Sequence, residues 1–295
     1  MTKKENKMGW IVKTILFDLL FVIFFFHGAC FANSPTIKEE RKTFIVTGAS
    51  GELGGATAKL LAHDYDLVLT GRDLAKLQNL KEELEAKNSG HYGICALDFI
   101  SNSSRDNFGE YLNQSHLSIA GLVLITPRPQ FCGKPLVQQD ENVWLEVFQR
   151  TFTGPLEALK VMLPYLSSPS KIVVIAGSTS VQLQPNYGSS CVIRRMWTTH
   201  TKALSHQLAH QGISINALSP GVVLTNFHKE RIQQQASENG LNYDDQMERE
   251  VANIPLHRHA KPQEVAQTIK FLLSEQSDFV NGINLVLDGG FTLSY

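Results

Sequence analysis

The sequence predicts an α/β fold in which a doubly wound parallel sheet carries helices on both faces. A short apolar strand at 44–46 runs into a glycine-rich turn and a helix, and strand-like and helix-like segments then alternate along the chain. Such alternation implies crossover connections, which place parallel strands between two layers of helices. No linker rich in proline or serine divides residues 43–295, so we expect a single domain there.

The segment 43–54, TFIVTGASGELG, is the first strand–turn–helix unit. Its three glycines let the backbone turn tightly, approach a pyrophosphate and pack the next helix on the sheet. The N-terminus of that helix adds free amide donors and a positive dipole end. A solvated structural turn is the alternative. The functional interpretation predicts cofactor contacts at Gly48, Ser50, Gly51, Leu53 and Gly54.

A second strand is predicted at 66–70, after a helix at 56–62 with a buried face. It ends in Gly71 and Arg72. Folds that select NAD place an acidic side chain here, whereas a basic one accommodates the extra phosphate of NADP. Arg72 therefore favours NADP(H) over NAD(H), unless it merely begins a solvated helix.

Later strands and helices continue the alternation. A long helical pattern covers 144–163, and another helix is expected from about Tyr187, with apolar positions at helical spacing. Further strands are predicted at 92–97, 119–125, 171–175, 213–217 and 284–287.

The order of landmarks over 43–291 resembles the short-chain dehydrogenase/reductase family. These landmarks are TGASGELG at 47–54, Asp98, NALSPGVVLT at 216–225, IPLHRHAKPQEVA at 254–266, FLLSEQSDFVNG at 271–282 and LVLDGG at 285–290. The resemblance implies a single-domain Rossmann fold of about seven strands. It also implies an NADP(H)-dependent oxidoreductase that transfers a hydride between nicotinamide and a carbonyl or alcohol substrate, as a homodimer or homotetramer. In this family Asp98 would lie near the adenine, and Pro220, Gly221 and Thr225 near the nicotinamide.

Departures from the family pattern gather where the chemistry is expected. Glu52 stands in place of the middle glycine of the turn, and residues 124–127 replace the common Asn-Asn-Ala-Gly. Thr151 aligns with the asparagine that supports the family's proton relay, so we assign it a weakened catalytic role.

The family's chemistry needs a tyrosine as general acid or base, a serine that binds the carbonyl oxygen, and a lysine one helical turn after the tyrosine. Tyr187 is the candidate tyrosine, but Cys191 stands four residues later instead of lysine. A free tyrosine has a pKa of about 10, and a nearby cation lowers it. The absence of that cation therefore weakens catalysis at neutral pH. Arg194, seven residues after Tyr187, is expected on the same helix face and could reach the ribose.

Ser178 is the expected substrate-binding serine, with Thr179 and Ser180 as alternatives in register. The opposing interpretation makes Tyr187 a helix-entry aromatic and Ser178 a loop residue. The protein would then be a catalytically degenerate relative that binds the dinucleotide for a regulatory or assembly role, or a membrane-bound scaffold without nucleotide.

The histidine pair, the charged segment 226–250 and the net charge point to no additional ligand. His206 and His210 share a helix face without a third ligand at a convincing spacing, so no metal site is predicted. The charged segment 226–250 occupies the position of the family's substrate lid, or is a solvated helical face. A net charge of −1 without a basic cluster does not indicate nucleic acid as a partner.

The N-terminal segment 1–33 has lysines before an apolar run and then small residues, which predicts a signal peptide or a membrane anchor, with 11–32 able to associate with a membrane. A short linker follows at 34–42. We expect a membrane-associated or exported protein, although exposure of the domain to the cytoplasm would suit an NADP(H) cofactor better. The four cysteines suggest no disulfide framework.

Overall fold

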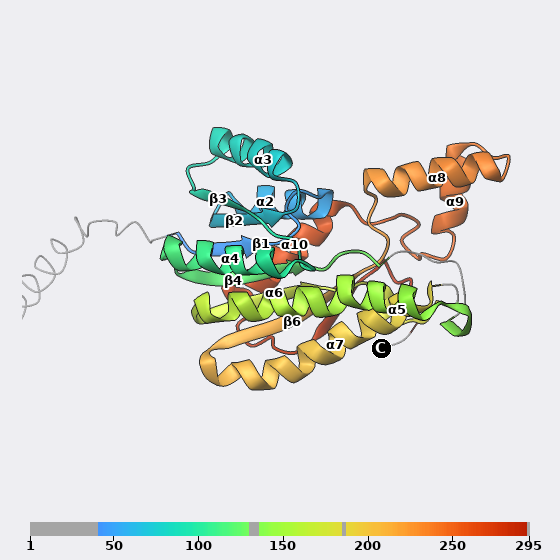
Figure 1. Cartoon of the computed structure of the whole chain (residues 1–295). Coiled ribbons are helices and arrows are strands. Elements are labelled where there is room, and N and C mark those ends of the chain that lie inside the picture. The colour runs from blue at the N-terminus through green and yellow to red at the C-terminus, as the bar shows by residue number, and fades with distance from the viewer. Residues whose placement is uncertain (1–40, 130–135, 185–186, 294–295) are drawn as a thin grey trace, which may run out of the picture. The chain divides into compact units, whose positions relative to one another are not determined.

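The computed structural model describes residues 41–129, 136–184 and 187–293, and within them seven parallel strands form one sheet. The strand order is β3-β2-β1-β4-β5-β6-β7. This arrangement confirms the predicted α/β fold (Figure 1). The strands are β1 (Thr43–Val46), β2 (Asp66–Gly71), β3 (Tyr92–Ala96), β4 (Ile119–Ile125), β5 (Leu166–Ile175), β6 (Ile213–Pro220) and β7 (Asn284–Leu287).

Helices cover both faces of the sheet. On one face the buried side chains of three helices share a hydrophobic cluster with the sheet: α2 (Glu52–Leu61), α3 (Leu74–Lys87) and α10 (Pro262–Leu273). On the other face the cluster is formed with α4 (Asn102–Ser115), α5 (Glu141–Phe148), α6 (Gly154–Met162) and α7 (Ser189–Leu208). Shorter helical turns are η1 (Leu136–Gln138), η2 (Gln149–Thr153), η3 (Leu163–Tyr165), η4 (Ser178–Ser180), η6 (Ala209–Gln211) and η7 (Glu275–Ser277).

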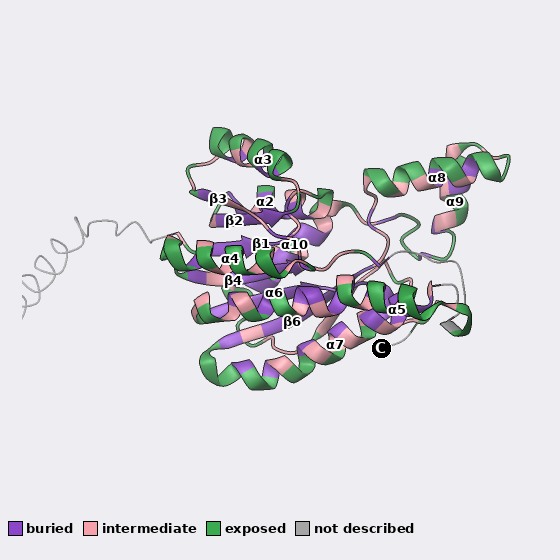
Figure 2. Cartoon of the chain, in the orientation of Figure 1, coloured by how far each residue is buried: buried purple, intermediate pink, exposed green. Residues whose placement is uncertain are grey.

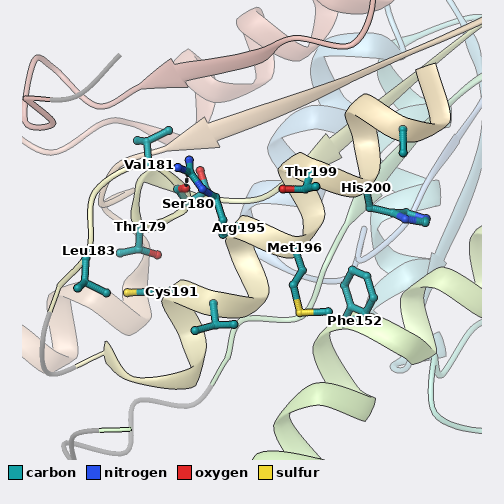
Figure 3. A pocket seen from close by; sticks show the side chains of 12 residues that line it. Phe152, Thr179, Ser180, Val181, Leu183, Cys191, Arg195, Met196, Thr199 and His200 are labelled. Atoms are coloured by element: carbon teal, nitrogen blue, oxygen red, sulfur yellow. Dashed lines mark hydrogen bonds between the residues drawn. The ribbon is translucent and has the colours of Figure 1, made fainter. Parts of the chain in front are cut away.

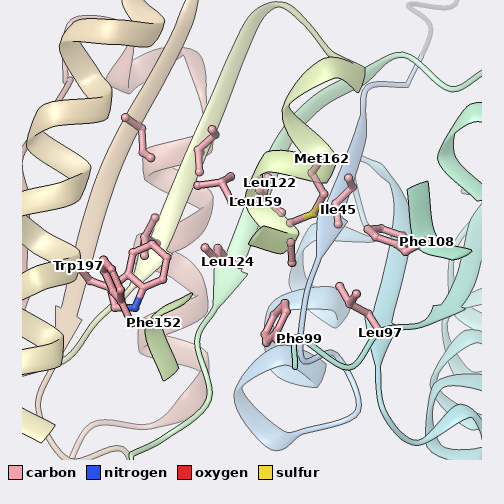
Figure 4. Packing of buried hydrophobic residues seen from close by; sticks show 14 of the residues in the cluster. Ile45, Leu97, Phe99, Phe108, Leu122, Leu124, Phe152, Leu159, Met162 and Trp197 are labelled. Carbon is pink, nitrogen blue, oxygen red and sulfur yellow. The ribbon is translucent and has the colours of Figure 1, made fainter. Parts of the chain in front are cut away.

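The central strands are apolar on both sides because both of their faces are covered. Successive side chains of β1 point to opposite faces, so Ile45 joins one cluster while Phe44 and Val46 join the other. Figure 2 shows the resulting buried layer along the sheet. In Figure 4 Trp197 lies against Phe152, with ring centroids 5.0 Å apart.

The helical pattern at 144–163 is not one regular α-helix. Helices α5 and α6 are separated by η2, a π-helical turn. The indole Nε1 of Trp197 on α7 donates a hydrogen bond of 2.8 Å to the carbonyl of Thr151 in this turn. The π-turn therefore lies where α7 forms a hydrogen bond to it. Hydrophobic periodicity along the sequence does not reveal such a contact.

The charged segment at 226–250 forms two helices, α8 (Asn226–Glu238) and α9 (Tyr243–Val251). They lie at the right of Figure 1, beyond the end of the sheet near which α5 is found. An ion pair of 2.5 Å between Arg231 of α8 and Glu250 of α9 joins the two helices. We refer to α8 and α9 together as the lid.

The predicted signal peptide or anchor and the linker after it lie almost entirely outside the described residues. Segment 1–33 lies outside the described residues, as does most of the linker at 34–42. Arg41, at the end of that linker, already contacts the domain, since its guanidinium donates to the carbonyl of Ala62 at 2.8 Å and pairs with Asp66 at 3.1 Å. Within the described residues, no helix combines the length and the apolar character needed to span a bilayer.

Candidate active site

Residues that follow the parallel strands gather at one edge of the sheet, because all the strands end there. The strand order reverses direction between β1 and β4, and ligands of open α/β sheets bind in the crevice at such a point. The residues at or just after the ends of successive strands include Gly48, Arg72, Asp98, Thr126, Gly177 and Gly221.

The glycine turn is shaped by two of its three glycines. Gly48 has a φ of +63°, which favours glycine. At Gly54 a Cβ atom would lie 2.2 Å from the carbonyl oxygen of Gly48, so helix α2 touches the turn directly. At Gly51 a Cβ atom would stay 3.4 Å from that oxygen, so Gly51 is not sterically required. This narrow turn before a helix N-terminus fits a pyrophosphate group.

The predicted NADP-selecting residue stands beside this turn. A Cβ atom on Gly71 would lie 2.5 Å from the hydroxyl of Ser50, so the turn and the end of β2 are in close contact. Helix α3 begins only at Leu74, capped by Asp73, whose carboxylate accepts from the amide of Lys76 at 3.0 Å. Arg72 therefore lies before the helix rather than in it, and its side chain is exposed at the edge of the site.

Glu52, which replaces the family's middle glycine, links the turn to the lid. It is the first residue of α2, and its carboxylate accepts a hydrogen bond of 2.7 Å from the amide of Asn226, the first residue of α8. Leu53 follows it and packs, partly buried, against the adjoining core cluster.

The other predicted cofactor residues take defined positions. Asp98 follows β3, and its carboxylate accepts from the amide of Ile100 at 3.2 Å. Pro220 ends β6, and a Cβ atom on Gly221 would lie 3.0 Å from that of Asp288, so this loop packs closely. Thr225 caps α8, and its hydroxyl lies 3.0 Å from Nδ1 of His228.

The structure corrects the expected placement of Tyr187 on a helix. Helix α7 begins at Ser189, and Gly188 before it has a φ of +48°. Tyr187 therefore lies in the preceding turn, and helical spacing does not relate it to Cys191 or Arg194. The helix residue one turn before Arg194 is the buried Ser190, which the sequence reasoning did not single out.

Of the three candidate hydroxyls in η4, two are engaged with other side chains. The hydroxyl of Thr179 accepts from Arg194 at 2.8 Å, and that of Ser180 lies 2.9 Å from the hydroxyl of Ser219. Ser180 also accepts from Asn284 at 3.3 Å. This leaves Ser178 as the hydroxyl of η4 whose position is not set by such a bond, and its role in substrate binding stays a prediction.

Arg194 lies against the end of β5. A Cβ atom on Gly177 would lie 2.9 Å from the guanidinium carbon, so the absent side chain of Gly177 leaves the space that Arg194 fills. Burial lowers the pKa of Arg194, and the charge of Arg128 lowers it further, while Tyr187 and Cys191 act in the opposite direction. Arg194 and Tyr187 do not share a helix face, because Tyr187 precedes α7.

Thr151 does not take the orientation expected of a relay residue. Its buried hydroxyl donates to the carbonyl of Val147 at 2.6 Å, within the helical segment. The hydroxyl proton is thus directed at the backbone, which argues against the predicted catalytic role.

Cys191, where lysine was expected, faces a different space. It lines a cavity of about 620 Å³ beside α7, together with Thr179 and Met196 (Figure 3). Its thiol lies 3.7 Å from the carbonyl of Gln184. Residues of the glycine turn do not line this cavity. The cavity is thus separate from the dinucleotide turn.

Arg128, which the sequence reasoning missed, reaches the lid. It follows β4 by three residues, and its guanidinium carbon lies 4.2 Å from the ring centroid of Phe227 on α8. Its position after a strand end is a signal that could have identified it. Desolvation, reinforced by Arg128 and Arg231, lowers the pKa of His228 to about 4, so this imidazole is neutral at pH 7.

The chain is similar to known reductases along most of its length. A family model described as enoyl-(acyl carrier protein) reductase matches residues 48–292. A 3-oxoacyl-[acyl-carrier-protein] reductase of Thermotoga maritima is 28% identical over 260 residues, covering 86% of this chain and 99% of that protein. A diacetyl reductase of Staphylococcus epidermidis is also 28% identical over 260 residues, covering 84% of this chain and 98% of that protein.

Two solved structures share the fold. L-sorbose reductase from Gluconobacter frateurii, complexed with NADPH and L-sorbose, superposes with a TM-score of 0.80 at 20% identity, covering 86% of this chain and 98% of its own. An NADPH-bound short-chain oxidoreductase from Pseudomonas aeruginosa that contains an atypical catalytic centre has a TM-score of 0.77 at 21% identity, with the same coverage of both chains.

The glycine turn gives a matched pair of variants. We expect Gly54→Ala to lower the free energy of unfolding by about 1–3 kcal/mol, because the added methyl group collides with backbone atoms. Gly51→Ser should change it by less than about 0.5 kcal/mol, because a serine fits the extended N-cap conformation. Urea unfolding of both variants measures the difference. Equal stability of the two would contradict the contact between α2 and the turn.

His228 predicts a pH dependence of stability. Its pKa is about 4 in the folded protein and about 6.5 when unfolded, so the unfolded chain binds more protons between these values. The neutral imidazole of His228 therefore contributes its full stability above about pH 6.5, and this contribution is lost as the pH falls toward about 4. We expect the Tm of His228→Gln to decrease less than the Tm of the parent when thermal unfolding is measured at pH 5 and at pH 7. An equal loss in both proteins would refute the assignment.

Proposed function

The chain belongs to the short-chain dehydrogenase/reductase family of oxidoreductases, and from this premise we propose that it uses NADP(H) to reduce a carbonyl compound or to oxidise the corresponding alcohol. The observation that carries the proposal is the contact of Gly54 with Gly48, which keeps side chains out of the turn where a pyrophosphate would bind. Reductases among the relatives support the reaction class.

The preference for NADP(H) rests on Arg72. Its exposed guanidinium stands between the end of β2 and the start of α3, where a 2′-phosphate would accept charge-assisted hydrogen bonds. NADPH in two solved structures of the same fold supports this choice.

We assign the chemistry to side chains at the end of β5 and the start of α7. NADPH supplies the hydride that reduces the carbonyl carbon. Ser178 donates a hydrogen bond to the carbonyl oxygen, and Tyr187 donates the proton that this oxygen takes up. Arg194 is assigned to the ribose hydroxyls, and its positive charge favours the negative charge that develops on the oxygen.

We further propose that the protein is a homodimer or homotetramer, as is common in its family. The N-terminal segment 1–33 is assigned to targeting or anchoring, so the compartment follows from whether that segment is removed.

Arg72→Ala should weaken NADPH binding selectively. We expect a loss of about 1–3 kcal/mol, the range for hydrogen bonds to a charged group, because the 2′-phosphate loses its partner. Calorimetric titration of the same variant with NADH is the internal control, since NADH lacks that phosphate. Equal losses for both cofactors would refute the selectivity, and no loss for either would remove Arg72 from the site.

Tyr187→Phe should lower kcat for NADPH oxidation on a carbonyl panel by about 10²–10⁴, because the proton donor is lost. NADPH affinity should stay unchanged. Tyr165→Phe is the control, since Tyr165 donates to the carbonyl of Gly109 rather than to a residue of the site. Turnover that survives Tyr187→Phe would place the proton donor elsewhere. A parent protein that binds NADPH but turns over no carbonyl would favour the catalytically degenerate alternative.

A further inference from the structure

Arginines from three parts of the chain surround the substrate end of the candidate site. Arg128 follows β4, Arg194 lies on α7 against the end of β5, and Arg231 lies on lid helix α8. Their charges influence one another: desolvation lowers the pKa of both Arg128 and Arg194, and the charge of Arg231 lowers the pKa of Arg128 further, as that of Arg128 does for Arg194.

Arg128 carries a charge that no carboxylate balances within the described part of the chain. Its recorded contact is the face of Phe227, 4.2 Å from the guanidinium carbon. A cation over an aromatic ring keeps the edge of its guanidinium open for hydrogen bonds. The contact thus holds Arg128 toward the lid without neutralising it.

The other two arginines keep unused donors. Nε of Arg194 is buried without a hydrogen-bond partner, although its Nη1 donates to Thr179. Arg231 pairs with Glu250 at 2.5 Å, yet its Nε is also buried and unpartnered. Buried donors without partners are costly, so two of them on these arginines are consistent with a bound acceptor.

Two carboxylates of the lid region are already engaged by other partners in the described structure. Glu250 pairs with Arg231 and lies 3.7 Å from Nε2 of the buried His259. Glu52 accepts from the backbone at the start of the lid. Burial and the nearby arginines lower the pKa values of His228 and His259, so both imidazoles are neutral at pH 7.

This local excess of positive charge is not a reflection of composition. The chain as a whole has a net charge of −1, with 27 basic and 28 acidic residues. Arg128 is exposed, whereas the Nε atoms of Arg194 and Arg231 are buried. Like charges repel one another more strongly where water is excluded, so the arrangement costs stability unless an anion offsets it.

We propose that the carbonyl substrate carries an anionic oxygen group, a carboxylate or a phosphate, which Arg128 binds while Arg194 and Arg231 add positive potential. This inference rests on the proposed function, since it describes the substrate of the same site. The phosphates of the cofactor are assigned elsewhere: the pyrophosphate to the glycine turn after β1 and the 2′-phosphate to Arg72 after β2.

The experiment compares acids with their uncharged esters. The probes are acetoacetate and 4-formylbenzoate, each tested beside its methyl ester, with NADPH oxidation and calorimetric binding to the NADPH-loaded full chain as readouts. The variant is Arg128→Gln. The control is Lys229→Gln, which removes the same charge from an exposed position on the same lid helix. Inorganic phosphate, added as a competitor, tests whether the site accepts that anion as well as a carboxylate.

We expect the parent to prefer at least one acid over its ester by tenfold or more in kcat/KM. Arg128→Gln should abolish this preference through a higher KM for the acid, with KM for the ester unchanged, whereas Lys229→Gln should keep it. Acid and ester used equally by the parent would overturn the inference while leaving the proposed function intact. The inference would also be overturned if Arg128→Gln bound NADPH more weakly and kept the preference for the acid. Arg128 would then bind a phosphate of the cofactor and not the substrate.

Calorimetry separates this inference from the proposed reaction. If no probe is turned over, tighter binding of an acid than its ester that disappears in Arg128→Gln would still support the anion site, although the proposed reaction would fail. Equal binding of acid and ester in the parent would overturn the anion site. Circular dichroism confirms that each variant is folded, and the comparison within the parent does not depend on any variant.

Discussion

The close approach of helix α2 to the glycine turn is the constraint on which the site depends. With the carbonyl oxygen of Gly48 only 2.2 Å from where a Cβ atom on Gly54 would lie, the backbones touch and no side chain can intervene. This contact fixes the N-terminus of α2 beside the point where the strand order reverses. Ser50 then packs against Gly71, and Glu52 reaches the first amide of the lid, so the turn contacts both the end of β2, before Arg72, and the start of α8.

The end of β5 shows how the site accommodates the loss of the family's lysine. Gly177 has no side chain, and Arg194 occupies the space that a Cβ atom would need. Arginine is longer than lysine and keeps its charge even when burial lowers its pKa. The bond to Thr179 fixes the guanidinium near the carbonyl site. A cation is therefore retained at this end of the sheet, although it comes from a different position and has a different shape.

The lid determines the electrostatic character of the substrate side. Arg231 and Glu250 join its two helices, and Phe227 of α8 contacts Arg128, which follows β4. Burial, reinforced by these surrounding charges, lowers the pKa of His228 to about 4 and keeps its imidazole neutral. Selectivity for the substrate would then come from the lid and the loop after β4, while the sheet and the glycine turn supply the cofactor site that the family shares.

The sequence by itself determined the fold and where the predicted cofactor residues stand along its strands. Strands β4 and β7 have the predicted bounds, and Arg72 follows β2 as expected, because local apolar runs and turn residues decide where buried strands begin and end. The substrate side was decided by tertiary structure. Gly188 ends the turn that keeps Tyr187 out of α7, so spacing along a helix misjudged its relation to Arg194. The contact of Arg128 with Phe227 joins residues far apart in the chain, and only the packing of the lid against the sheet edge brings such charges together.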